Sequence, residues 1–230
     1  MTIPQTVQFI DDKIFILDQT KLPFKEEFII TDDYERASEA IEKLEIRGAP
    51  AIGVVAAYAL ALSIKNKNGY TDILFNNAYK RLQSTRPTAV NLFYGLDEIK
   101  KVYNQHKNDN NLYKILIERA KEIHEEDIKM CSEIARNGLR LFKRRCNVLT
   151  HCNAGALATG GNGTAINVIR YAYENDLVNF VHVDETRPLL QGSRLTAWEL
   201  SNYGIPFSIN SDSTAATLMR EGKVDIVIVG

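Results

Sequence analysis

From Cys146 to the end of the chain, short apolar segments of strand length alternate with longer segments of helical periodicity. This order is typical of a parallel sheet whose crossover helices pack on its faces. We therefore predict a Rossmann-like domain over residues 146–230. Its expected strands are Val148–Cys152, Val178–Val183, Pro206–Ile209 and Asp225–Val229, and its expected helices are Thr164–Glu174, Leu190–Tyr203 and Ser213–Glu221.

The first part of the chain has a different pattern. Alternating apolar residues over Thr6–Ile10 and Lys13–Leu17 predict a β-hairpin, and a third strand is expected over Glu26–Thr31. Helices are expected from Asp32 or Asp33, from Pro50, and over Thr71–Ser84, Thr88–His106 and Leu112–Lys143. The predicted fold class is therefore α/β. It comprises a small N-terminal domain of short antiparallel strands and helices (1–111), a connecting helix (112–145) and the Rossmann-like domain (146–230).

The junction Val148–Ile166, between the first strand and the first helix of the Rossmann-like domain, is rich in glycine and contains a cysteine. It matches neither of two common nucleotide-binding motifs, the Walker loop and the dinucleotide fingerprint. Gly161-Asn162 stand where a Walker loop needs Lys-Ser/Thr, and the dinucleotide fingerprint lacks its third glycine. A strand end beside a helix N-terminus is open to an anionic ligand and favours a thiolate. Two interpretations of Cys152 stay open: a functional thiol, or a small buried residue at a tight turn.

Two arginines precede predicted helix starts in the N-terminal domain. Arg47 comes before Gly48-Ala49-Pro50, where proline and a run of small residues indicate a buried, closely packed helix. Arg86 lies in a loop between two helices that Pro87 separates. A guanidinium beside free helix amides can hold a phosphate. An arginine that caps a neighbouring helix is an equally good explanation of Arg47.

Polar residues follow the predicted strands of the Rossmann-like domain, in the segments Cys152-Asn153, Asp184-Glu185-Thr186-Arg187 and Asn210-Ser211-Asp212. Such sheets bind ligands at the carboxyl ends of their strands, so these residues are expected to face one crevice. A carboxylate in this position can also cap the helix that follows, and for Asp212 we favour the cap.

Composition and motifs exclude several classes of function for this chain. The 230 residues are 45% hydrophobic and 25% charged with a net charge of -1, and the basic residues are scattered, which predicts no nucleic-acid partner. The most apolar helical stretch, Ala49–Ile64, is too short and too rich in alanine for a membrane span. Three cysteines without a CxxC pair favour a reducing cytoplasm. No metal site is expected, because Ile128 occupies the second histidine position of an HExxH match that begins at His124.

Several segments together resemble a known family: RGAPAIG (Arg47–Gly53), RPTAVNL (Arg86–Leu92), THCNAG (Thr150–Gly155), ETRPLLQGSRLTAWEL (Glu185–Leu200) and DSTAA (Asp212–Ala216). In this order, over most of the chain, they are similar to the 5-methylthioribose-1-phosphate isomerases. That family is shared with the ribose-1,5-bisphosphate isomerases and with the regulatory subunits of the eukaryotic translation-initiation guanine-nucleotide exchange factor. The cysteine of THCNAG, together with RGAPAIG and RPTAVNL, resembles the methylthioribose-phosphate branch more than the others.

The resemblance implies an aldose–ketose isomerase of methionine salvage that acts on 5-methylthioribose 1-phosphate without a metal or nucleotide cofactor. It implies that Cys152 is catalytic and that the substrate is bound by Arg47, Gly48, Ala49, Arg86 and Gln191. It also implies a cytoplasmic homodimer when the protein is full length. The alternatives are a ribose-1,5-bisphosphate isomerase and a non-catalytic binding protein like the exchange-factor subunits, which generally lack this cysteine.

The chemistry gives these roles a physical reason. Because C1 carries a phosphate, ring opening needs acid assistance at the ring oxygen, and moving hydrogen from C2 to C1 needs a second acid–base group. Cys152 can fill one role and a carboxylate the other, whether hydrogen moves as a proton or as a hydride. The arginines would hold the phosphate, which prevents its elimination and fixes C1 and C2.

Members of the family continue after the last predicted strand with Gly-Ala-Asp-Arg, whose aspartate is their proposed acid–base partner, whereas this chain ends at Gly230. The resemblance therefore implies a Rossmann-like domain that is incomplete at its C-terminus. It also implies a 230-residue chain that is nearly inactive, weakly stable and prone to associate. Asp184, Glu185 and Asp212 are the carboxylates that would otherwise supply the acid.

Overall fold

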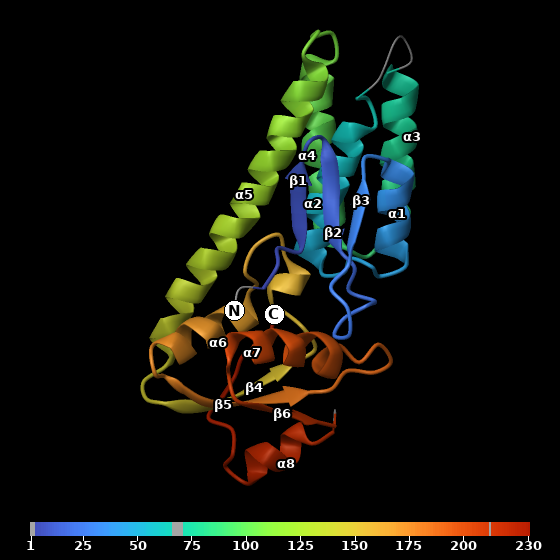
Figure 1. Ribbon diagram of the computed structural model, residues 1–230. Coiled ribbons are helices and arrows are strands. Elements are labelled where there is room, and N and C mark those ends of the chain that lie inside the picture. Colours follow the sequence, from blue (N-terminus) through green and yellow to red (C-terminus); the bar gives the residue numbers. More distant parts are fainter. Residues whose placement is uncertain (1–2, 66–70, 212) are drawn as a thin grey trace. The chain divides into compact units, whose positions relative to one another are not determined.

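The computed structural model of the protein describes residues 3–65, 71–211 and 213–230 (Figure 1). These residues form two compact units. The helical unit contains Gln5–Thr20 and Glu26–Asp127, and the parallel-sheet unit contains Lys21–Lys25, Ile128–Gly230 and the described residues before Gln5. Helix α5 (Leu112–Gly138) contributes residues to both. The division into domains at residues 111 and 145 stays a prediction.

The antiparallel sheet of the helical unit runs in the order β1-β2-β3, with β1 (Val7–Ile10), β2 (Lys13–Leu17) and β3 (Phe28–Thr31). The predicted hairpin is confirmed, with Ile10 paired to Lys13. Its turn residues, Asp11 and Asp12, both have positive φ, 50° and 56°. A two-residue loop with this geometry matches the right-handed twist of the strands that it joins.

The helices of this unit, besides the first part of α5, are α1 (Tyr34–Glu42), α2 (Ala49–Leu62), α3 (Thr71–Gln83) and α4 (Val90–His106). Asp33 caps α1, since its carboxylate accepts the Glu35 amide at 3.0 Å. Helix α2 begins one residue before the predicted Pro50. Helix α4 begins two residues after the predicted Thr88, because Ala89 still has extended backbone, with φ of -85° and ψ of 97°.

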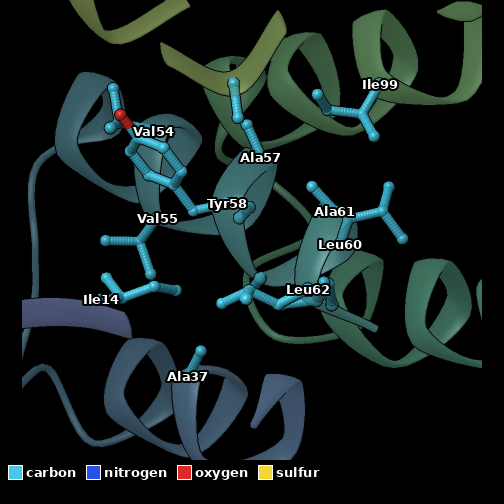
Figure 2. Close-up of a cluster of buried hydrophobic side chains, with 14 of the residues drawn as sticks. Ile14, Ala37, Val54, Val55, Ala57, Tyr58, Leu60, Ala61, Leu62 and Ile99 are labelled. Carbon is cyan, nitrogen blue, oxygen red and sulfur yellow. The ribbon is translucent and has the colours of Figure 1, made fainter. Parts of the chain in front are cut away.

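Helix α2 lies at the centre of the core of the helical unit (Figure 2). Every residue from Ala51 to Leu62 is buried. A helix without a polar face has to be surrounded by other elements. The close-up shows Ile14 of β2, Ala37 of α1 and Ile99 of α4 around it. The run of small and apolar residues in the sequence is therefore explained by burial on all sides.

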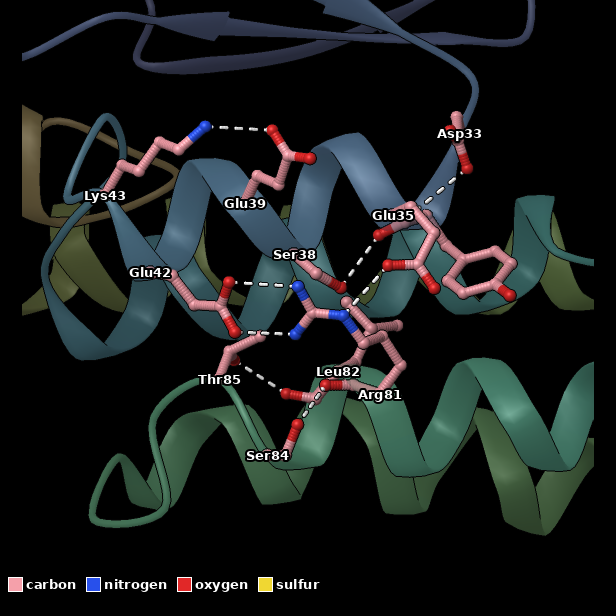
Figure 3. A network of polar contacts seen from close by, with 11 residues as sticks. Asp33, Glu35, Ser38, Glu39, Glu42, Lys43, Arg81, Leu82, Ser84 and Thr85 are labelled. Atoms are coloured by element: carbon pink, nitrogen blue, oxygen red, sulfur yellow. Dashed lines mark hydrogen bonds and ion pairs between the residues drawn. The ribbon is translucent and has the colours of Figure 1, made fainter.

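An arginine on α3 ties that helix to α1 on the surface of the same unit (Figure 3). Arg81 Nη1 and Nη2 bind the two carboxylate oxygens of Glu42 at 2.6 and 2.9 Å, and its Nε binds Glu35 at 2.9 Å. A planar guanidinium that pairs with a carboxylate through two hydrogen bonds fixes the orientation of both groups. Arg81 thus stabilises the packing of α3 against α1.

The parallel-sheet unit has the strand order β6-β5-β4-β7, and every pairing is parallel. This confirms the predicted parallel sheet and the α/β class. The strands are β4 (Cys146–His151), β5 (Val178–Asp184), β6 (Phe207–Asn210) and β7 (Ile226–Val227). Strand β7 is shorter than the expected Asp225–Val229.

Helices α6 (Ala165–Glu174) and α7 (Ala197–Tyr203) lie on one face of this sheet and α8 (Ala215–Arg220) on the other (Figure 1). A π-helical turn, Gly192–Thr196, runs directly into α7, so the predicted helix Leu190–Tyr203 is only partly α-helical. Short 3-10 turns cover Leu139–Leu141 and Ala156–Ala158.

The long connecting helix ends earlier than expected. Helix α5 stops at Gly138 rather than at Lys143. A Cβ on Gly138 would lie 2.6 Å from a methyl group of Val168, so this end of α5 packs directly on α6. Among residues 3–65, 71–211 and 213–230, no helix combines the length and the apolar character needed to cross a bilayer.

Candidate functional site

Cys152 is the first residue after β4, at the carboxyl edge of the parallel sheet. Its backbone is left-handed, with φ of 59°, a conformation that costs a non-glycine residue roughly 1–3 kcal/mol. Cys152 is half-buried, whereas Cys131 and Cys146 are buried. Of the free cysteines, Cys152 is therefore the one that a ligand can reach most easily.

The glycine-rich loop after Cys152 folds back on itself. Gly155 and Gly163 form a short antiparallel bridge, and a Cβ on Gly163 would lie 2.3 Å from the Gly155 carbonyl carbon. Gly163 also has a φ of 91°. Gly161 approaches α5, where a Cβ would lie 2.9 Å from the Cα atom of Ile128. Close packing of the backbone explains why these positions are occupied by glycine, which has no Cβ atom.

A buried hydroxyl holds the first two residues of the loop. Thr196, the last residue of the π-helical turn, is 0% exposed. Its Oγ1 donates a hydrogen bond to the carbonyl oxygen of Cys152 and accepts one from Asn153 Nδ2 at 3.2 Å. The strained backbone of Cys152 is thereby tied to a residue that lies 44 positions later in the chain.

A buried carboxylate holds the rest of the loop. Glu199 of α7 is 0% exposed and accepts a hydrogen bond from Asn153 Nδ2 at 2.8 Å. The backbone amides of Ala156 and Leu157 donate to the same carboxylate at 2.8 and 3.3 Å. The sequence predicts a loop that is open to an anionic ligand beside the N-terminus of the helix that follows. In the structure these amides bind an internal one, because the crossover helix brings Glu199 beneath the loop.

The loop after β5 is organised by a second carboxylate. Glu185 accepts hydrogen bonds from the amides of Thr186, Gly192 and Ser193 at 2.7, 3.0 and 3.1 Å. Burial by itself raises the pKa of the Glu185 carboxyl, but the hydrogen bonds from Ser193, Thr186 and Gly192 outweigh burial and lower that pKa. Glu185 therefore accepts hydrogen bonds from these amides as an ionised carboxylate. Because its pKa is lowered, it is a poor candidate for a general acid.

Gln191 lies just before the π-helical turn and is half-buried. Its Oε1 atom is buried and has no hydrogen-bond partner within the described part of the chain. A buried amide oxygen without a partner costs free energy until a donor reaches it. Gln191 thus has an acceptor available for a ligand hydroxyl.

The polar clusters predicted at the strand ends do lie along one edge of the sheet. His151, Asp184 and Asn210 are neighbours in register on β4, β5 and β6. His151 Nδ1 lies 3.6 Å from Asp184 Oδ2, and Asp184 is buried while His151 is exposed. Asp212, the last residue of the third cluster, lies outside the described residues, so its predicted role as a cap stays a prediction.

The predicted substrate-binding residues of the helical unit lie at helix starts. Gly48 precedes α2 with a φ of 88°, Ala49 is the first residue of α2, and Arg47 is half-buried just ahead of them. Arg86 lies in the turn before α4 and is half-buried, with its carbonyl accepting the Ala89 amide at 3.0 Å. Its guanidinium makes no hydrogen bond or ion pair with any residue that the structure describes.

Helices α2 and α4 cross close to their first turns. A Cβ on Gly53, in the second turn of α2, would lie 2.5 Å from the carbonyl oxygen of Asn91 at the start of α4. Neither helix start has a side-chain cap among the described residues. Two helix N-termini with open amides are therefore held together within the helical unit, an arrangement that favours an anion such as phosphate.

No group of three or more His, Cys, Asp or Glu side chains in the described residues is arranged to hold a metal ion. His124, which begins the HExxH match, is buried and lies 3.2 Å from the Tyr58 hydroxyl through its Nδ1 atom. That histidine belongs to the core of the helical unit. The absence of a metal or other cofactor stays a prediction.

The predicted site residues thus form two groups in different units, Arg47, Gly48, Ala49 and Arg86 in the one and Cys152 and Gln191 in the other. Their roles remain predictions. The sequence analysis missed Thr196 and Glu199. The one available signal was a carboxylate inside the apolar segment LTAWEL, since a charged residue at a core position has to be paired.

The fold and the site define a mixed α/β protein with a small antiparallel sheet, a Rossmann-like parallel sheet and a cysteine at a strand end. A family model described as the initiation factor 2 subunit family matches residues 45–230. The chain belongs to that family.

Among its relatives, a methylthioribose-1-phosphate isomerase from Caldicellulosiruptor saccharolyticus is 46% identical over 227 residues, which are 97% of this chain and 66% of the relative. The crystal structure of 5-methylthioribose 1-phosphate isomerase from Pyrococcus horikoshii superimposes with a TM-score of 0.92 at 36% identity, over 100% of this chain and 66% of that one. Translation initiation factor eIF-2B subunit delta from A. fulgidus gives a TM-score of 0.84 at 37% identity, over 99% of this chain and 68% of that one. The chain therefore spans about two thirds of the length of these proteins.

Proposed function

We propose that the protein is an aldose–ketose isomerase that converts 5-methylthioribose 1-phosphate to 5-methylthioribulose 1-phosphate. The observation that carries this proposal is the 46% identity to a methylthioribose-1-phosphate isomerase over nearly the whole chain. The half-buried thiol of Cys152 at a strand end also supports it, as does the Arg86 guanidinium, which has no partner among the residues that the structure describes. A cytoplasmic homodimer belongs to the same proposal.

Cys152 acts at the reacting carbons in this proposal. A phosphate on C1 blocks spontaneous ring opening, so the ring oxygen has to be protonated and hydrogen has to move from C2 to C1. A thiol can give and take a proton near neutral pH. The half-buried position of Cys152 suits this role, because partial exclusion of water strengthens electrostatic interactions at the reacting atoms.

The phosphate is held by Arg86 and Arg47, with help from the amides of Gly48 and Ala49. Guanidinium groups bind phosphate oxygens through two parallel hydrogen bonds, and helix amides add the favourable end of the helix dipole. Gln191 accepts a hydrogen bond from a substrate hydroxyl. Support comes from the absence of another partner for the Arg86 guanidinium and the Gln191 Oε1 atom within the described residues.

Turnover of 5-methylthioribose 1-phosphate in the presence of EDTA, followed by phosphorus NMR, tests the proposal. In the full-length protein we expect product formation that Cys152→Ser abolishes with little change in substrate affinity. Cys146→Ala is the matched control, because Cys146 lies at the opposite end of β4. A Cys152→Ser variant that turns over at the rate of the unmodified protein would contradict the catalytic role.

The solved structure of an eIF-2B delta subunit, at 37% identity, favours a second candidate, a binding protein without catalysis. That function predicts no turnover and a stable complex with partner subunits. Ribose 1,5-bisphosphate defines a third outcome, since a higher kcat/KM with that sugar would make it the substrate. Measuring both sugars side by side, with size-exclusion chromatography of the same sample, separates these functions.

A further inference from the structure

We propose that Thr196 and Glu199 are positioning residues that fix the backbone of the Cys152 loop and so orient the thiol. This inference deepens the proposed isomerase function and rests on it for its kinetic part. Neither residue belongs to the predicted substrate-binding or catalytic set. All contacts that carry the inference lie within the parallel-sheet unit.

The first contact acts directly on Cys152. A residue with a φ of 59° is held in a sparsely populated conformation, and such a conformation persists only where the surroundings impose it. Thr196 Oγ1 donates to the carbonyl oxygen of this same residue. Because Thr196 is 0% exposed, water cannot readily replace the hydroxyl.

The second contact fixes the other side of the loop. Glu199 accepts hydrogen bonds from the Asn153 side chain and from the amides of Ala156 and Leu157. A Cβ on Gly155 would lie 2.0 Å from a Glu199 carboxylate oxygen, so the loop closes tightly around the carboxylate. A buried charge with three donors is a rigid anchor, and removing it leaves those donors unpaired.

The two anchors are joined to each other. Asn153 Nδ2 donates to both Thr196 Oγ1 and Glu199 Oε1, at 3.2 and 2.8 Å. The π-helical turn places Thr196 directly before α7, three residues ahead of Glu199. One rigid segment therefore sets the position of Cys152 and of the residues that follow it.

The test compares Thr196→Val, which has the same shape without the hydroxyl, with Thr196→Ser, which keeps it. Reacting groups displaced by about 1 Å can lose about a hundredfold in rate. We expect Thr196→Val to lower kcat by about tenfold to a hundredfold with KM within about twofold, and Thr196→Ser to restore most of kcat. The control is Ser201→Ala, which removes an exposed hydroxyl on α7.

A second readout does not depend on turnover. The second-order rate constant for alkylation of Cys152 by iodoacetamide, measured from pH 6 to pH 9 by mass spectrometry, reports the orientation and environment of the thiol. We expect Thr196→Val and Glu199→Gln to change this constant at least about threefold, while Thr196→Ser and Ser201→Ala leave it unchanged. Cys131 and Cys146 serve as internal references, because both are buried.

The inference is wrong if Thr196→Val and Glu199→Gln fold with a cooperative thermal transition and keep the kcat and the alkylation rate of the unmodified protein. If the unmodified protein lacks isomerase activity, the proposed function fails, and the alkylation series still decides whether these residues position Cys152. If Glu199→Gln does not fold, the comparison of Thr196→Val with Thr196→Ser alone decides whether the inference holds.

Discussion

Gly53 of α2 and Gly95 of α4 touch through their backbones, since a Cβ on Gly95 would lie 2.4 Å from the carbonyl oxygen of Gly53. This contact sets the distance between the two helices whose first turns follow Arg47 and Arg86. It links the packing of the helical unit to the proposed phosphate site.

Gly95→Ala should therefore weaken both stability and phosphate binding. Placing a methyl group against a backbone oxygen forces the helices apart and costs about 1–3 kcal/mol. Thermal unfolding measures the stability and KM reports the binding. Asn104→Ala, on an exposed position of α4, is the control and should change neither. Unchanged unfolding of Gly95→Ala would show that the helices separate without cost.

Arg86 and Arg81 offer a matched pair of arginine substitutions. Arg86→Ala should raise KM about tenfold to a hundredfold, because a hydrogen bond to a charged group contributes about 1.5–3 kcal/mol. Arg86→Lys should recover only part of this, since an ammonium lacks the planar fork. Arg81→Ala should lower the unfolding temperature with little effect on KM, because Arg81 is occupied by Glu42 and Glu35. Equal KM values for Arg86→Ala and Arg81→Ala would remove Arg86 from the phosphate site.

Iodoacetamide at neutral pH should label Cys152 before Cys131 and Cys146. Of these free cysteines, only Cys152 is not buried. The Cys146 thiol also donates a hydrogen bond to the Arg144 carbonyl oxygen. Peptide mapping after short labelling times gives the order. Earlier modification of either buried cysteine would argue against a reactive Cys152.

Stability should depend on pH through Glu185. The pKa of this carboxyl in the folded protein lies below its ordinary value of 4.5, despite partial burial that acts to raise it. A depressed folded pKa means that Glu185 stabilises the fold above the ordinary pKa, and this contribution is lost as the pH falls through the folded value. Glu185→Gln should therefore unfold at a lower temperature than the unmodified protein at pH 7, with the difference shrinking below pH 4.5. A difference that stays constant from pH 7 to pH 3 would show that the charge of Glu185 does not matter.

Local patterns were enough for the order of the elements and for the strand-end position of Cys152. Strand alternation, helical periodicity and capping residues act over a few neighbouring positions, so β2 matches its predicted bounds and Asp33 caps α1 as expected. The element ends differ most where packing decides them. Helix α5 stops at Gly138, which packs on Val168 of another helix and is followed by a 3-10 turn, and a π-helical turn replaces the start of the predicted helix Leu190–Tyr203.

The sequence by itself determined the α/β class, the parallel sheet, and the arginines and the cysteine placed at helix starts and at a strand end. Only the tertiary structure decided which groups hold the Cys152 loop. Thr196 and Glu199 reach it from 44 and 43 residues away in the chain. The physical reason is that a buried carboxylate is unfavourable in isolation and becomes favourable only when the crossover brings amide donors to it.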